Sequence, residues 1–179
     1  NTKQTKSINK GKDVSIESKG TGVIATGTDY FNVWSGSFQG SQVNLSGNVD
    51  IKAVDASDPS KDGIAILSKL DSTVIGNGKM TIQGDLVSQK NLGTGQRYDW
   101  VEDPDTGEWN PIITDVSSEK SSTIDLTMTN GSVFTGSANS ADRDGLGAID
   151  PNIAPPPSVV SSGQGTINLD MTGSQWNMT

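Results

Sequence analysis

Short runs in which every second residue is apolar recur along most of the chain. The two most similar runs are Ser122–Gly136 and Gly165–Thr179, each an alternating segment, a Gly-Ser corner and a second segment with an aromatic residue. At an offset of 43 residues, the equivalent apolar positions are Ile124 and Ile167, Leu126 and Leu169, and Met128 and Met171. Past the corner Phe134 corresponds to Trp176, at an offset of 42. Alternation with period two predicts β-strands, and its recurrence predicts stacked units.

Weaker versions of the pattern predict further strands at 13–18, 20–27, 29–36, 42–47 and 48–54. In Asp29–Gly36 we expect Phe31 and Val33 on one face, with Tyr30, Asn32 and Trp34 on the other. Three sets of echoes relate these strands: Val49 and Ile51 to Val14 and Ile16 (offset 35), Met80 and Ile82 to Val43 and Leu45 (offset 37), and Ile64 to Val23 (offset 41). Variable offsets with a constant local pattern predict six or seven turns of similar cross-section, with corner loops of different length.

Three segments depart from the alternation. Asp55–Gly63 is a polar turn cluster, whereas 92–114 and 139–163 are longer excursions. The centre of the first excursion predicts a hairpin with strands at Tyr98–Val101 and Trp109–Ile113 and a turn at Asp103–Gly107. We therefore predict a polar tail at 1–12 and one stacked domain at 13–179 that contains both excursions.

The fold class predicted by these patterns is all-β, with strands stacked in a parallel β-helix, because no stretch has helical periodicity. Asn48, Asn77 and Asn130 are candidates for left-handed corner residues. An antiparallel β-sandwich is the alternative architecture. Self-similarity and low aromatic content favour the stack.

Composition agrees with a thin core, since only 31% of residues are hydrophobic, 5% are aromatic and 21 are glycine. The net charge is −8 and the basic residues are dispersed, so we expect no nucleic-acid partner. No apolar run could cross a bilayer, and we expect no membrane insertion by this segment. Because the sequence starts at NTKQTK without a signal peptide and stops at WNMT, we expect a fragment of a longer polypeptide.

Cysteine and histidine are both absent. This excludes disulfides, thiolate nucleophiles and Ser/His/Asp chemistry from the segment, and it removes the commonest metal ligand. We predict no cofactor.

The segments Thr123–Phe134 and Thr166–Trp176, which share the form xIxLxMTxGSxW, resemble passenger domains of Gram-negative autotransporters. Gly22–Gly27 and Asp62–Leu67 resemble rungs of the same proteins. The resemblance implies a right-handed parallel β-helix exported to the bacterial cell surface. It also implies adhesion, in attachment to a host-cell, matrix or glycan receptor, or in self-association with another copy as in biofilms.

Two other functions remain open. β-Helices include polysaccharide lyases and hydrolases, among them enzymes of the phage-tailspike type. Glycoside hydrolysis needs two carboxylates, and candidates for such a pair include Asp50, Asp85 and Asp125. With 21 acidic residues, pairs also occur by chance, and the only arginines, Arg97 and Arg143, lie in the excursions. We therefore predict no catalysis. A purely structural stalk is the third reading.

The predicted binding site is the acidic, aromatic hairpin of the first excursion. Long loops on rigid scaffolds often carry function, although the same residues could pack across their own hairpin. Its candidate residues are Tyr98, Trp100, Glu102, Asp103, Asp105, Glu108 and Trp109. Asp103 and Asp105, like Asp142 and Asp144, have the alternating acids of a calcium loop but lack its remaining ligands, and Asp-Gly turn chemistry explains them equally well. Trp34, Phe134 and Trp176 could stack on carbohydrate, but we expect Phe134 and Trp176 to be packing residues.

Overall fold

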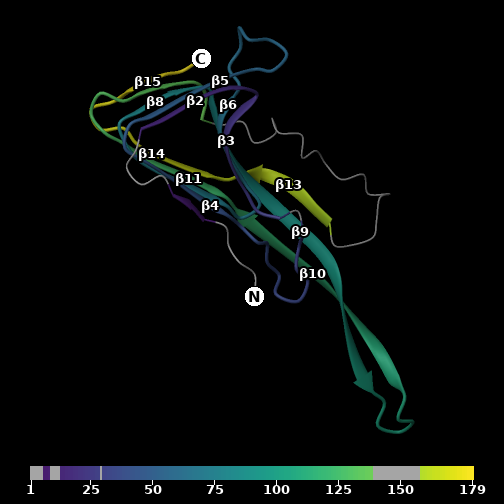
Figure 1. Cartoon of the computed structure of the whole chain (residues 1–179). Helices are drawn as coiled ribbons and strands as arrows, with labels where there is room; N and C mark the ends of the chain where they lie inside the picture. The colour runs from purple at the N-terminus through teal and green to yellow at the C-terminus, as the bar shows by residue number, and fades with distance from the viewer. Residues whose placement is uncertain (1–5, 9–12, 29, 139–157) are drawn as a thin grey trace.

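A computed structural model of the chain describes residues 6–8, 13–28, 30–138 and 158–179. Every regular element in these ranges is a β-strand, and the strands form three sheets (Figure 1). The first sheet has the order β1 (Lys6–Ile8), β4 (Gln42–Ser46), β7 (Thr73–Gly78), β11 (Thr123–Met128), β14 (Thr166–Asp170). The second has the order β2 (Val14–Lys19), β5 (Val49–Val54), β8 (Met80–Gln83), β12 (Val133–Thr135), β15 (Gln175–Asn177). The third contains β3 (Thr21–Thr26), β6 (Ile64–Lys69), β9 (Asp85–Glu102), β10 (Trp109–Ser121) and β13 (Ser158–Gln164).

The chain visits the three sheets in the same order each time, and one passage is called a rung here. All neighbours in the first and second sheets pair in parallel. The all-β class and the parallel stacking are therefore confirmed, and the arrangement is compatible with a β-solenoid. Parallel sheets do not fit the antiparallel sandwich. Five strands line up in each of the first two sheets, so the prediction of six or seven turns is too high for the described residues.

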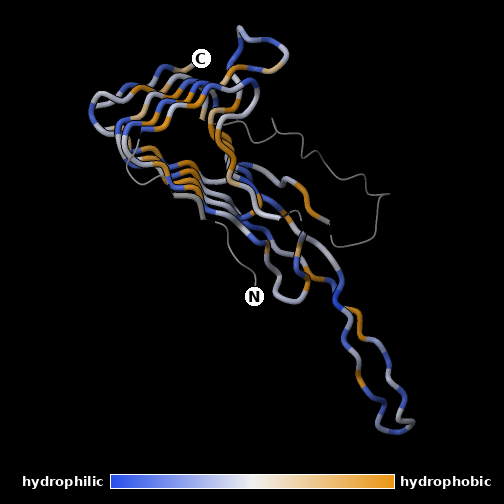
Figure 2. The backbone as a smooth tube through the Cα atoms, in the orientation of Figure 1, coloured by the Kyte–Doolittle hydropathy of each residue, from blue (hydrophilic) through white to orange (hydrophobic). Residues whose placement is uncertain are grey.

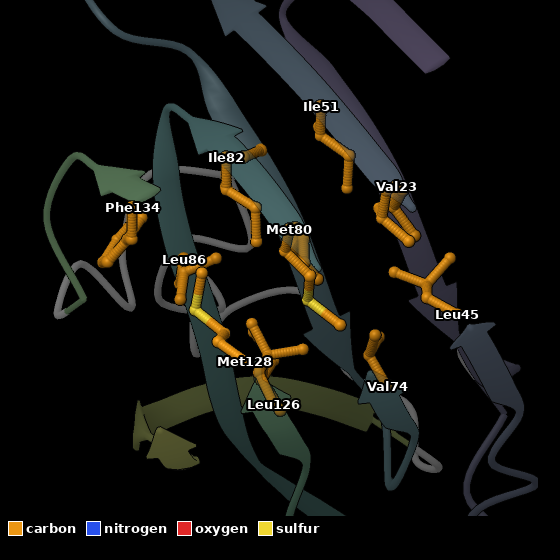
Figure 3. Close-up of a cluster of buried hydrophobic side chains, with 14 of the residues drawn as sticks. Val23, Leu45, Ile51, Val74, Met80, Ile82, Leu86, Leu126, Met128 and Phe134 are labelled. Carbon is orange, nitrogen blue, oxygen red and sulfur yellow. The ribbon is translucent and has the colours of Figure 1, made fainter. Parts of the chain in front are cut away.

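The core lies between the sheets and is built from the alternate apolar residues. In the second sheet, the pairings place Ile16, Ile51, Ile82, Phe134 and Trp176 in one ladder. Ile51, Ile82 and Phe134 are buried. The exposed residues that alternate with the buried ones along these strands make a polar outer face. Figure 2 shows the apolar positions repeating from strand to strand, and Figure 3 shows side chains from all three sheets meeting in this core.

The register of the strand pairs shows which of the predicted sequence offsets are correct. Ile124 pairs with Ile167, and Val14 pairs with Val49, which confirms the offsets of 43 and 35. By contrast, Val49 pairs with Met80, so the prediction of 37 for that rung is wrong and the offset is 31. The offset of 41 is also wrong, because Val23 pairs with Ile66 at 43. In both cases the predicted offset differs from the observed offset by an even number of residues. A shift of this kind keeps each side chain on the same face of its strand, so the alternation of apolar and polar residues cannot reveal it.

The predicted left-handed asparagines are a second correction. Asn48, Asn77 and Asn130 do not have positive φ; the left-handed backbone falls on the adjoining glycine, for example at Gly47 (φ 87°) and Gly78 (φ 145°). A side chain at Gly78 would overlap the backbone of Gly47 in the rung beneath. Only glycine combines the positive φ with this close approach, so the glycine takes the position and the asparagine lies beside it.

Residues 32–37 form a turn closed by a bridge between Asn32 and Ser37, so the strand predicted at 29–36 is wrong in its described part. The Oδ1 atom of Asn32 accepts hydrogen bonds from the backbone N–H groups of Trp34 (2.9 Å) and Ser35 (3.2 Å), and Gly36 has a φ of 61°. An asparagine side chain that bonds its own following backbone favours a turn over a ladder. The predicted facing nevertheless holds for Phe31, which is buried, and for Trp34, which is exposed.

Two long segments leave the stack between the third sheet and the first. They are the loop 27–41 and the hairpin β9–β10, and β13 pairs along β9 at the base of the hairpin. A ladder of serines holds this corner: Ser72 Oγ accepts from Ser41 N (2.9 Å), and Ser122 Oγ accepts from Ser72 N (3.2 Å). The loop 27–41, the base of the hairpin and β13 therefore lie side by side although they are far apart in sequence.

The predicted boundaries change at several points. Pairing between β9 and β10 runs from Lys90 to Ser121, so the first excursion is longer than 92–114. Within the predicted tail, β1 pairs with β4 and joins the first sheet. Most of the second excursion, including Asp142 and Asp144, lies outside the described residues, and its end forms β13 along β9. The polar turn cluster of Asp55–Gly63 is a loop between β5 and β6.

Candidate functional site

The most distinctive feature of the molecule is the two-stranded ribbon formed by β9 and β10. β9 begins as a strand of the third sheet, where Asp85–Ser88 pair with β6, and then continues beyond the stack with β10 as its antiparallel partner. Figure 1 shows the ribbon projecting far from the three sheets. We call 96–115 the distal ribbon. It contains six of the twelve exposed large apolar side chains of the described residues.

The base of the ribbon is anchored by a small second core. Phe31, Phe38 and Leu70 are buried together, and Val116 of β10 and Val159 of β13 pack against them. The rings of Phe31 and Phe38 lie 5.4 Å apart. Both aromatic residues come from the loop 27–41, so this loop acts as a brace that is separate from the main core.

One face of the ribbon carries the brace. Gly93 pairs with Ser118, and its missing side chain leaves room for the Phe31 ring. Two strand pairs further out on the same face, the Arg97 guanidinium lies 5.8 Å from the ring centroid of Trp34. Arg97 Nε also donates to Asp99 Oδ2 at 2.9 Å. The face that continues through Arg97 and Asp99 is called the braced face.

Among the described residues, none provides such a cover on the opposite face of the distal ribbon. Cross-strand partners in an antiparallel ladder point to the same side, so the register defines this face. Its pairs are Gln96 with Asp115, Tyr98 with Ile113, Trp100 with Pro111, and Glu102 with Trp109. Tyr98, Trp100, Trp109 and Ile113 are 49–60% exposed. We call these eight residues the bare face; in Figure 2 apolar and polar colours alternate along this part of the chain.

Polar groups enclose the apolar centre of the bare face at both ends. Near the stack, Gln96 Nε2 donates to Asp115 Oδ1 at 2.9 Å, and Tyr98 Oη donates to Gln96 Oε1 at 3.3 Å. Near the tip, Glu102 lies opposite Trp109. An apolar centre with a polar rim is the usual anatomy of a protein interface.

The ribbon ends in a tight turn organised by Asp103. Its Oδ1 accepts from the backbone N–H groups of Asp105 (2.8 Å) and Thr106 (3.2 Å), while its own N–H donates to the Glu108 carbonyl at 2.7 Å. Gly107 closes the turn with a φ of 72°. Asp103 is therefore a turn-forming residue, as the Asp-Gly interpretation predicted.

The seven predicted site residues are brought together only in part. Tyr98, Trp100, Glu102 and Trp109 share the bare face, whereas Asp103, Asp105 and Glu108 belong to the tip. The prediction missed four members of the bare face: Gln96, Pro111, Ile113 and Asp115. The sequence contained a signal for these four residues. Once Glu102 and Trp109 are taken as the pair that closes the turn, the other cross-strand pairs follow by counting residues outward along both strands.

The acidic residues predicted as candidates for glycoside hydrolysis or metal binding do not come together within the described residues. Asp50 and Asp125 are exposed on different sheets, and Asp85 is buried with its Oδ1 accepting from Ser137 N at 2.9 Å. No group of acidic side chains within the described residues is arranged to hold a metal ion. The rings of Phe134 and Trp176 stack 5.5 Å apart. Phe134 is fully buried, which confirms its predicted packing role, whereas Trp176 packs on it with one side and stays 44% exposed.

Two carboxyl groups near the ribbon base have shifted pKa values. A hydrogen bond with Ser162 of β13, together with Lys90, lowers the pKa of Glu119, whose carboxylate lies 3.3 Å from Lys90 Nζ. Burial raises the pKa of Asp71, and the nearby Lys120 acts in the opposite sense. Asp71 and Leu70 are also the only non-glycine residues with positive φ in the described part of the chain.

The described residues include no helix that is long and apolar enough to cross a membrane. Comparison of the chain with protein-family models, with curated proteins and with solved structures gave no match.

Proposed function

We propose that this chain is a non-catalytic adhesive module of a bacterial cell surface. In this proposal the stack of sheets is the scaffold, and the distal ribbon is the element that attaches to a receptor. The observation that carries the proposal is the bare face, where Tyr98, Trp100, Trp109 and Ile113 are exposed together on a ribbon whose other face contacts Trp34 through Arg97.

The energetics of the ribbon support a binding role. An isolated two-stranded ribbon is marginally stable in water, and within the described residues no third strand pairs with the distal ribbon. Each of the three aromatic side chains on the bare face can still bury on the order of 100 Å², which corresponds to about 2.5 kcal/mol per ring before the costs of association. A partner covering the face would therefore gain from surface that folding left exposed.

The finer architecture belongs to the same proposal. We propose that the stack is the right-handed parallel β-helix of an autotransporter passenger, displayed outside the cell. The repeated order of the three sheets, the ladder from Ile16 to Trp176 and the absence of cysteine support this reading. An experimental structure in which the rungs wind left-handed would contradict it.

A deletion tests the adhesive function. Because Gln96 and Asp115 are paired, residues 97–114 can be replaced by a two-residue Asn-Gly turn that closes the shortened ribbon and leaves the base intact. Beads coated with the full chain or with this variant are compared for attachment to cultured cells and to immobilised extracellular matrix. We expect at least a tenfold loss of attachment, on the order of what removing a central interface residue causes.

The matched control shortens a different exposed loop. Val54 and Asp62 form an isolated bridge across the loop between β5 and β6, so 56–60 can be replaced by Asn-Gly in the same way. This control should attach like the full chain. If the ribbon deletion attaches equally well, the adhesive proposal is wrong, and a structural stalk becomes the better reading.

A further inference from the structure

We propose that the partner of the bare face is a cationic polypeptide surface, that is, a protein segment with apolar side chains bordered by lysine or arginine. This inference rests on the proposed adhesive function and adds the chemistry of the receptor. It is carried by the charge of the distal ribbon and by the arrangement of that charge around the apolar centre.

The distal ribbon is strongly acidic. It contains one basic residue, Arg97, against six carboxylates, a formal net charge of −5 out of −8 for the whole chain. The six are Asp99, Glu102, Asp103, Asp105, Glu108 and Asp115. Such a concentration of one sign steers partners of the opposite sign and disfavours those of the same sign.

The single positive charge does not reach the bare face. Arg97 lies on the braced face, where it contacts the Trp34 ring and donates to Asp99. The lysines nearest along the ribbon are at its base, where Lys90 is paired with Glu119 and Lys120 lies near the Asp71 carboxylate. The charged side chains of the bare face itself are therefore both carboxylates, Glu102 at the tip end and Asp115 at the stack end.

This distribution decides between the candidate partners. A second ribbon of the same chain would bring −5 against −5, so self-association through the bare face is disfavoured. Nucleic acid, acidic glycans and anionic lipid surfaces are disfavoured for the same reason. A neutral glycan would stack on flat aromatic rings. In the two central pairs of the bare face, however, Tyr98 and Trp100 are each paired with a residue of non-planar aliphatic surface, Ile113 and Pro111. Apolar protein side chains flanked by basic ones satisfy both the centre and the rim.

The experiment uses the full chain and synthetic probes of defined charge. The probes are an immobilised peptide of alternating Lys and Leu, the matching peptide of Glu and Leu, polylysine, and heparin as an anionic polymer. Binding is measured by surface plasmon resonance at salt concentrations of about 0.05 M and about 0.5 M, because screening separates charge from apolar contact. We expect the Lys-Leu peptide to bind, with weaker binding at high salt, and the Glu-Leu peptide and heparin not to bind.

Two variants connect this binding to the bare face. The double reversal Glu102→Lys and Asp115→Lys should weaken Lys-Leu binding at least about tenfold. Trp100→Ser should weaken Lys-Leu binding by a similar factor while leaving polylysine binding within about twofold, because it removes apolar area and no charge. The control is Asp50→Lys with Asp125→Lys, which makes the same change in net charge at exposed positions on the stack. It should retain most of the Lys-Leu binding.

The outcomes separate the two proposals. If the Glu-Leu peptide or heparin binds as well as the Lys-Leu peptide, or if the ribbon reversal is no worse than the stack reversal, the cationic partner is wrong. A Trp100→Ser variant that binds Lys-Leu normally would equally overturn docking through the bare face. In these cases the adhesive function still stands, provided that ribbon deletion abolishes cell and matrix attachment. If that deletion has no effect on attachment, the adhesive function itself has failed.

Discussion

Gly93→Ala tests how the ribbon is held to the stack. Gly93 lies at the centre of the ribbon base, paired with Ser118 of β10 and with Val159 of β13. A Cβ at this position would overlap the ring of Phe31, with Cε2 at 2.8 Å and two other ring atoms closer still. Phe31 is fully buried and contacts Phe38, so it has little space to move. Overpacking of this kind costs about 1–3 kcal/mol, and we expect a value of about 2 kcal/mol here.

The measurement is a double-mutant cycle with Phe31→Ala. That variant alone should lose about 3–5 kcal/mol, because it empties the small core that braces the ribbon. In its background Gly93→Ala should cost less than about 0.5 kcal/mol, which gives a coupling of about 1.5–2 kcal/mol. Stability is followed by urea unfolding with tryptophan fluorescence, and by hydrogen exchange of the β9 and β10 amides.

Ser117→Ala is the control for this cycle, since Ser117 is an exposed residue of the same part of β10. It should change stability by no more than about 0.5 kcal/mol. Equal costs of Gly93→Ala in the presence and absence of the Phe31 ring would refute the packing account of the brace.

Three further predictions concern the stack and the brace. Phe134→Ala should cost about 3–5 kcal/mol in urea unfolding, and Trp176→Ala clearly less, because Phe134 is fully buried and Trp176 is 44% exposed. Asp71→Asn should stabilise the protein at pH 7 more than at pH 3. Burial raises the pKa of Asp71 in the folded state, so the carboxylate form costs stability as the pH rises above 3.8; the urea midpoints at the two pH values measure the difference. Arg97→Ala should shift the fluorescence of Trp34 and cost less than about 1 kcal/mol, since this cation–π contact is exposed.

Each of these has a contradicting result. Equal losses of unfolding free energy for Phe134→Ala and Trp176→Ala would mean that this pair of rings is not part of the buried ladder. An Asp71→Asn effect that is the same at both pH values would assign it to backbone conformation, because asparagine tolerates a positive φ, and not to the carboxylate charge. A loss above about 2 kcal/mol for Arg97→Ala would show that the braced face depends on Trp34 more than on the Phe31 core.

The position of the ribbon was predictable, but its functional face was not. The cluster of Tyr98, Trp100 and Trp109 stood out because it interrupts the alternation, and the predicted turn at Asp103–Gly107 is where the strands reverse. Alternation alone does not say which face of a free hairpin will be covered. That depends on Phe31 and Trp34, which precede the ribbon by more than 50 residues and were assigned to a strand of the stack.

By itself, the sequence determined the class of structure and the register where repeats are strong. Period-two alternation of Ile124, Leu126 and Met128 requires strands with one buried face, and its near copy at Ile167–Met171 fixes a parallel pair. Tertiary structure decided the rest. Which strands stack at weaker echoes depends on corner lengths, because a slip of two residues leaves every side chain on its own face. The separation of a braced from a bare face depends on contacts between segments distant in sequence, and no local pattern encodes them.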